Sequence, residues 1–94
     1  MIERQDGGRL LITAPLTMAN ARGLLEAGRS ALRQGEVVFD FSTVNEADSS
    51  AIAVMLGWLR AADAAGARVR FAHIPAGVRA LAELYGVTDL LPLA

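Results

Sequence analysis

One stretch of the sequence, residues 36–66, constrains the fold more than any other. It opens with the apolar run 37–41, whose β-branched and aromatic residues are typical of a buried strand. A polar connection then leads to Asp48, Ser49 and Ser50, and a nearly continuous apolar helix pattern follows directly. Asp and Ser cap helix N-termini because their side-chain oxygens accept hydrogen bonds from the free backbone N–H groups there. The stretch therefore predicts a strand, a turn and a capped helix with two hydroxyls and a carboxylate at its N-terminus.

The rest of the sequence predicts strands and helices in alternation. Further strands are expected at residues 2–5, 9–13 and 68–72, the first two joined by a Gly7-Gly8 turn. Helices are expected at residues 18–34, 49–65 and 76–85. Alternation of this kind favours parallel strand pairs with right-handed crossovers. We expect one α/β domain, residues 1–94, with a mixed sheet of about four strands and about three helices packed on it.

The ends of the helices are predicted from capping residues. Thr17 is expected to cap the first helix, and Gly35 to end it in the left-handed conformation. Met18 is the first of the apolar positions expected on the buried face of that helix. In the last helix, Tyr85 is expected to point inward and Gly86 to end the helix.

Composition indicates a folded domain with a surface for a partner. Hydrophobic residues make up 53% of the 94 positions and charged residues 20%, which excludes a disordered chain. This is more apolar surface than one small core hides easily, so a partner surface is expected. All nine basic residues are Arg, scattered along a chain of net charge −1. Without a basic stripe, nucleic-acid binding is not expected.

The sequence offers no set of residues for catalysis or for holding a metal or cofactor. Lys and Cys are absent, which removes a phosphate-loop lysine, a Schiff-base lysine, a thiol nucleophile and Cys metal ligands. His73 is the only His, and it is expected at a strand end. Asp40 and Asp48 lack a neighbouring His, Lys or Cys for acid–base chemistry, so they are expected to be a surface carboxylate and a helix cap.

The sequence also bears on where the protein works. The first residues, MIERQDGG, lack the apolar segment of a signal peptide. No apolar run is long enough to span a bilayer. We therefore expect a cytoplasmic protein.

The order strand, turn, Asp48-Ser49-Ser50 and apolar helix resembles the STAS domain, the fold shared by anti-sigma-factor antagonists and the cytosolic tails of sulfate transporters. The resemblance covers nearly the whole chain, including the ending LAELYGVTDLLPL. Within the family, the sequence is most similar to the STAS subunit of the Mla (maintenance of lipid asymmetry) ABC transporters of bacteria. An apolar helix that ends in Leu-Tyr and is followed shortly by Leu-Pro is typical of that subunit, and residues 84–85 and 91–92 match it.

The resemblance implies a non-catalytic accessory subunit that binds and supports the ATPase of a phospholipid-trafficking ABC transporter. Membrane contact would then be indirect, through the transporter complex at the inner membrane face. The alternative is an anti-sigma-factor antagonist whose partner kinase phosphorylates Ser49. Such antagonists usually have Gly where this chain has Ala51. A third, weaker alternative is a nucleotide-binding STAS module, which no phosphate-binding motif in the sequence supports.

The same resemblance assigns the candidate site. The family's phosphorylatable hydroxyl directly follows the Asp, so it corresponds to Ser49, where Mla subunits have Thr. A partner-contact role is therefore expected for Asp48, Ser49 and Ser50. The alternative for these residues is helix capping alone.

The helix that follows is apolar on two faces, and one of them is expected to bind the partner. The first face is expected to pack against the sheet and consists of Ile52, Met55, Leu56 and Leu59. The second face is expected to be partly exposed and to extend the partner site, with Ala51, Val54 and Trp58. Trp is enriched at interface hot spots. The alternative is that Trp58 packs against a neighbouring helix as part of the core.

Overall fold

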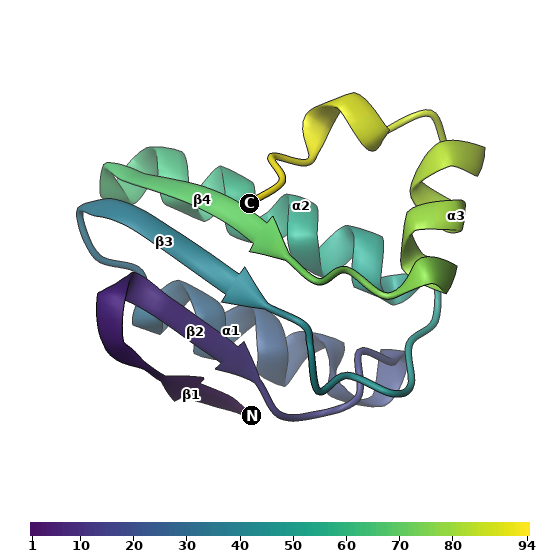
Figure 1. Cartoon of the computed structure of the whole chain (residues 1–94), viewed down its shortest axis with the longest axis horizontal. Helices are drawn as coiled ribbons and strands as arrows, with labels where there is room; N and C mark the ends of the chain where they lie inside the picture. The colour runs from purple at the N-terminus through teal and green to yellow at the C-terminus, as the bar shows by residue number, and fades with distance from the viewer.

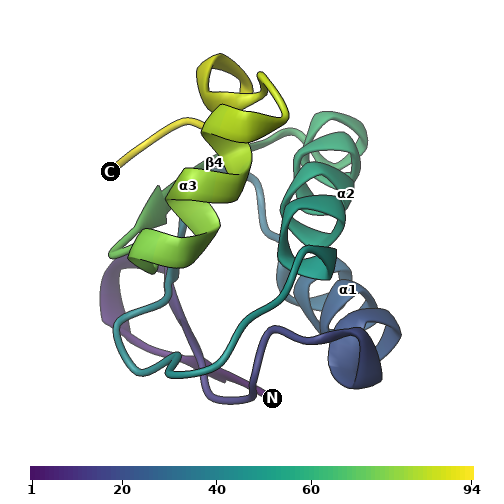
Figure 2. The same cartoon turned by 90° about the vertical axis from the view of Figure 1, so that its right-hand side faces the viewer.

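The computed structural model describes all 94 residues and shows a four-stranded sheet in the order β1-β2-β3-β4. Figure 1 shows the sheet in front, and Figure 2 shows α1 and α2 together on one of its faces with α3 beyond its end. Strands β1 and β2 pair antiparallel, and β2, β3 and β4 are parallel neighbours. The α/β prediction is confirmed. The strands are β1 (Ile2–Arg4), β2 (Arg9–Ile12), β3 (Gly35–Asp40) and β4 (Ala67–Ala72), and the helices are α1 (Ala21–Ala31), α2 (Ser50–Ala65) and α3 (Ala76–Leu84).

The predicted hairpin between the first two strands is present. Gly7 and Gly8 turn the chain with φ angles of 74° and 76°, which side chains with a Cβ rarely adopt. A Cβ on Gly8 would also lie 2.6 Å from the Glu36 carbonyl oxygen. Glycine is therefore required at this position both for the turn and for close packing against β3.

The predicted ends of α1 are wrong. Residues Met18–Asn20 form a separate 3-10 turn, and Thr17 makes no side-chain capping bond. The helix ends at Ala31, and Gly35, with φ 93°, opens β3 instead of closing the helix. Met18 lies outside the helix, where it is 71% exposed and its backbone N–H donates to the Asp48 carboxylate.

The ends of the other two helices agree better with the sequence. Gly66 closes α2 in the left-handed conformation, and its N–H donates to the Ala62 carbonyl. Gly86 follows α3 with φ 69°. Tyr85 was expected to point inward but is 51% exposed, since the helix has already ended at Leu84.

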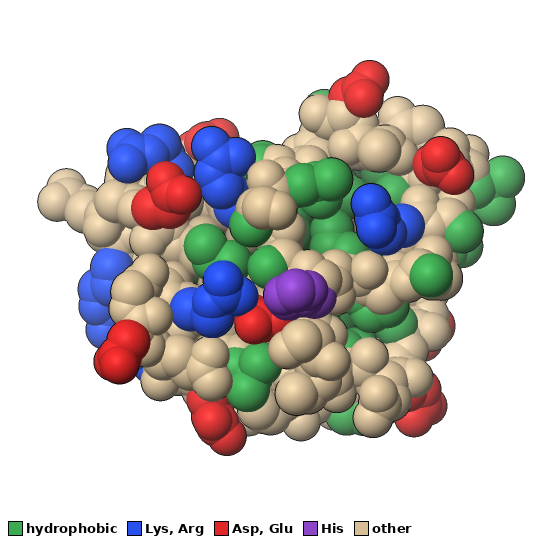
Figure 3. Space-filling view, in the orientation of Figure 1, with side chains coloured by type: hydrophobic (Ala, Val, Ile, Leu, Met, Phe, Trp, Pro, Cys, Tyr) green, Lys and Arg blue, Asp and Glu red, His purple; other side chains and the backbone are tan.

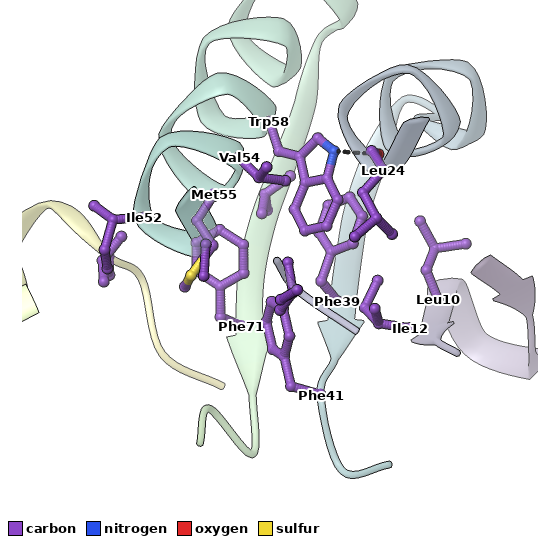
Figure 4. Close-up of a cluster of buried hydrophobic side chains, with 14 of the residues drawn as sticks. Leu10, Ile12, Leu24, Phe39, Phe41, Ile52, Val54, Met55, Trp58 and Phe71 are labelled. Carbon is purple, nitrogen blue, oxygen red and sulfur yellow. Dashed lines mark hydrogen bonds between the residues drawn. The ribbon is translucent and has the colours of Figure 1, made fainter. Parts of the chain in front are cut away.

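The core lies between the sheet and the pair α1 and α2. Phe39 and Trp58 stack with their rings 4.0 Å apart and nearly parallel. Phe41 and Phe71 complete an aromatic cluster around this pair (Figure 4). Large, flat side chains thus join β3 and β4 to α2. None of the helices is long and apolar enough to cross a membrane.

The other face of the sheet is not covered by a helix, and most of its charged side chains are paired. Arg9 lies 2.8 Å from the Asp40 carboxylate, and Arg70 lies 3.4 Å from Glu36. Figure 3 shows Arg, acidic and apolar side chains mixed on this face. The last residues, around Leu93, pair with Phe71 along the outer edge of β4.

Candidate partner-binding site

Asp48 organises the N-terminus of α2. Its carboxylate accepts hydrogen bonds from the Ser50 hydroxyl, the Ser50 backbone N–H at 2.9 Å and the Met18 backbone N–H at 2.9 Å. Its own N–H donates to the Leu16 carbonyl, 3.0 Å away. Asp48 therefore caps α2 and also joins the loop before α1 to the loop after β3.

These bonds favour the charged form of Asp48. The bond from the Ser50 side chain, followed by those from the Met18 and Ser50 backbones, holds the pKa of Asp48 below its ordinary value. A charged carboxylate at a helix N-terminus is also favoured by the helix dipole. The loop geometry around the site is therefore set by an ionised Asp at neutral pH.

Ser49 presents a free hydroxyl at this helix end. It is exposed and makes no capping bond with its side chain. The first N–H groups of α2 are already occupied: those of Ser50 and Ala51 donate to Asp48, and that of Ile52 donates to the Ser49 carbonyl. A phosphate on Ser49 would lie beside the Asp48 charge, and these three N–H groups would not be free to bind it. Modification of Ser49 would therefore act on a bound partner more than on the fold.

Ser50 is oriented differently. It is 7% exposed, and its hydroxyl is bound to Asp48. The structure thus gives the two serines different roles: Ser49 faces solvent and Ser50 supports the cap.

The expectation that Ala51, Val54 and Trp58 form an exposed face is wrong. Their exposed fractions are 0%, 3% and 0%, respectively. The Trp58 indole N–H donates to the Leu24 carbonyl at 3.1 Å, and the ring stacks on Phe39 (Figure 4). These three residues pack into the core and are not available to a partner in this structure.

The face of α2 that was expected to pack against the sheet is only partly buried. Met55 and Ile52 are buried as expected, but Leu56 and Leu59 are only partly buried. The exposed residue nearest to Ser49 on the same face of α2 is Ala53, one turn further along. The accessible surface around Ser49 therefore continues along Ala53.

Met18 is a site residue that the sequence analysis missed. It is exposed and hydrogen-bonded through its N–H to the same carboxylate that caps α2. Asn20, a residue type preferred at helix N-caps, directly precedes α1 and could have indicated that Met18 lies outside the helix. A large, flexible and exposed apolar side chain on a segment that is bound to Asp48 suits a protein contact.

No three His, Asp or Glu side chains lie close enough together to hold a metal ion. Burial raises the pKa of Asp40, but hydrogen bonds from Ser42 and from Arg9 outweigh it, so the pKa lies below its usual value. A carboxylate that stays ionised and bound to Arg9 serves as a structural anchor and not as a proton donor.

Comparison with known proteins identifies the family. A family model described as "Mlab, STAS domain" matches residues 2–92. The chain belongs to this STAS-domain family. No curated protein matches the sequence at a significant level.

Solved structures show the same STAS fold at low sequence identity. An anti-sigma factor antagonist from Thermotoga maritima has a TM-score of 0.74 at 13% identity, over 99% of this chain and 83% of that one. A STAS-domain protein from Planctomyces limnophilus has a TM-score of 0.76 at 10% identity, over 99% and 86%. The antagonist SpoIIAA in its unphosphorylated form has a TM-score of 0.72 at 16% identity, over 100% and 86%.

Proposed function

We propose that this STAS domain is a non-catalytic subunit that binds and supports the ATPase of a phospholipid-trafficking, Mla-type ABC transporter. The observation that carries the proposal is the match of residues 2–92 to the Mlab family. The exposed Ser49 at the position of the family's hydroxyl supports it. The domain would work in the cytoplasm and reach the inner membrane face only through the transporter.

The geometry suits a rigid docking surface. Asp48 fixes two loops and the start of α2, so Ser49 and Met18 are presented without a cost for ordering the loops on binding. The ATP chemistry belongs to the partner, because this chain has no Lys and no phosphate-binding loop. The domain would therefore act by holding the ATPase in an active arrangement.

The test is direct binding to the ATPase of an Mla-type transporter from the same organism. Purified wild-type protein should bind it and raise its ATP turnover within the transporter. Ser49→Arg and Ser49→Asp should weaken binding by about 30-fold or more, as expected for a residue at the centre of an interface.

Ser30→Arg is the matched control, since Ser30 is an exposed serine near the C-terminus of α1, at the opposite end of the helix pair from Ser49. The control should bind like the wild type. Wild-type affinity in the Ser49 variants would show that the interface lies elsewhere, and no binding by the wild-type protein would refute the proposed function.

A second candidate is an anti-sigma-factor antagonist switched by phosphorylation. The free, exposed hydroxyl of Ser49 favours it, because a kinase can reach this serine and not the buried Ser50. Mass spectrometry of the protein from its native cells distinguishes the two candidates. A phosphorylated fraction at Ser49 would favour the antagonist, and its absence across growth conditions would favour the transporter subunit.

A further inference from the structure

A shallow groove runs along the outer surface of the α1 and α2 pair. Its first part has a volume of about 660 Å³ and lies between Ala53 on α2 and Leu25 on α1. Its second part, about 330 Å³, continues past Gly57 to Ala64. Both parts are bordered by Leu25 and Arg60, so they form one continuous surface, which we call the helix groove.

The groove exists because α2 has small residues on its outer side. Trp58 points into the core, which leaves Ala53 and Ala64 exposed on the outer side of α2, while Gly57 between them is buried against Leu25. A Cβ on Gly57 would lie 2.6 Å from the Leu25 side chain, so the absence of a side chain lets Leu25 pack against the α2 backbone there. The floor is therefore apolar and close to the backbone, which suits a partner element of regular shape.

The rim of the groove has a surplus of positive charge. Arg22 and Arg60 border it and make no ion pair or hydrogen bond within the chain, whereas the rim carboxylate Glu26 is bound to Arg29 at 3.2 Å. The other arginines, Arg79 apart, are partnered: Arg9, Arg68 and Arg70 with carboxylates, and Arg4 and Arg33 with backbone carbonyls. Two of the three unpartnered arginines thus border one apolar groove.

We propose that the helix groove binds an amphipathic helix of the partner ATPase whose apolar face carries flanking acidic residues. This inference rests on the proposed function, and it names the element that the partner supplies. From Ala53 to Ala64 the groove is about 16 Å long, which accommodates about three helical turns. Acidic residues on the bound helix would pair with Arg22 and Arg60, and the apolar face would cover Leu25.

The groove also adjoins the N-terminus of α2. Ala53 lies one turn from Ser49 on the same side of the helix. A helix in the groove would therefore extend the contact that begins at Ser49 and Met18, so one partner can cover both. The rim arginines are charged but unpaired in the free chain. They would therefore speed the approach of an acidic partner and favour it over a partner without acidic residues.

The test is the affinity and the salt dependence of binding to the same ATPase. The double variant Arg22→Glu with Arg60→Glu should bind at least about 30-fold more weakly, and the loss of affinity with rising salt that the wild type shows should largely disappear. Arg33→Glu with Arg68→Glu changes the net charge equally at exposed positions outside the groove. This control should stay within about twofold of the wild type and keep its salt dependence.

Two further variants test the shape and the charge pairing. Ala53→Phe fills the exposed floor with a bulky side chain and should also prevent binding while the fold, followed by circular dichroism, is unchanged. Lys substitutions at the acidic positions of the ATPase helix should restore binding to the Arg22→Glu, Arg60→Glu variant.

The outcomes separate the two proposals. If the wild type binds and Ser49→Arg does not, but the groove variants bind normally, the helix groove is wrong and the proposed function stands. If the control double variant loses as much affinity as the groove variant, the effect is net charge alone and the groove is wrong. If the wild type does not bind the ATPase at all, both proposals fall.

Discussion

Trp58 is the side chain on which the core converges. It is 0% exposed and stacks on Phe39, and its indole N–H donates to the Leu24 carbonyl. Its ring is therefore packed and its polar group is hydrogen-bonded. Buried Trp residues need such an acceptor for the N–H. Its environment in the free domain is therefore that of a core residue and not of an interface anchor.

Substitution of Trp58 should therefore act on stability. Trp58→Ala should lower the free energy of unfolding by about 3–5 kcal/mol, since it leaves a large cavity. Trp58→Phe keeps a ring near Phe39 and loses mainly the hydrogen bond, so it should cost less than Trp58→Ala. Urea denaturation followed by circular dichroism measures both.

The fluorescence of the single Trp provides an independent check. The wild type should emit at a blue-shifted wavelength and resist iodide quenching, with or without partner. Emission typical of an exposed indole would contradict this burial.

At the scale of the elements, the packing of α1 on α2 depends on one glycine. Gly28 faces the Trp58 indole so closely that a Cβ at this position would overlap the ring nitrogen. The absence of a side chain at position 28 lets the indole reach the Leu24 carbonyl one turn earlier. The two helices can therefore lie side by side on the sheet with the Trp between them.

Gly28→Ala should destabilise the domain, although Ala favours helices. The gain in helix propensity is about 1 kcal/mol, and the overpacking against Trp58 costs about 1–3 kcal/mol or more. Gly77→Ala is the control, because Gly77 is a helical position in α3 with nothing within 4 Å of the added methyl group. Thermal unfolding should show a lower midpoint for Gly28→Ala and an equal or higher one for Gly77→Ala.

At the scale of the whole molecule, two aspartates hold segments that are distant in sequence. Asp40 links β3 to β2 through Arg9, and Asp48 links the loop before α1 to the start of α2. The pKa of each lies below its ordinary value, so the native state binds fewer protons than the unfolded chain in mildly acidic solution. The stabilisation from both is complete above the unfolded pKa of about 4 and is lost as the pH falls through the lower native pKa.

Acid unfolding should reveal the stabilisation that Asp40 and Asp48 provide. The wild type should lose stability as the pH falls below about 4, and Asp40→Asn with Asp48→Asn should reduce that loss, with lower stability at neutral pH. Asp63→Asn is the control, since Asp63 is exposed and makes no ion pair or hydrogen bond. Equal acid dependence in the double variant and the wild type would refute the role of the two carboxylates.

The sequence by itself determined the features that depend on neighbours along the chain. The alternation of strands and helices, the hairpin at Gly7-Gly8 and the position of Ser49 at a helix N-terminus were all predicted. Periodicity, capping and turn chemistry act over a few residues, so they can be read from local sequence.

Only the tertiary structure decided which way α2 faces and what surrounds the site. A helix that is apolar on most sides carries little information about its orientation, and the room that Gly28 leaves for Trp58 selected one face. Met18 lies in the 3-10 turn before α1, where its N–H donates to Asp48 from a distant loop. Arg22 and Arg60 border one groove because α1 and α2 lie side by side. Contacts between residues that are far apart in the chain set these features, and no local pattern encodes them.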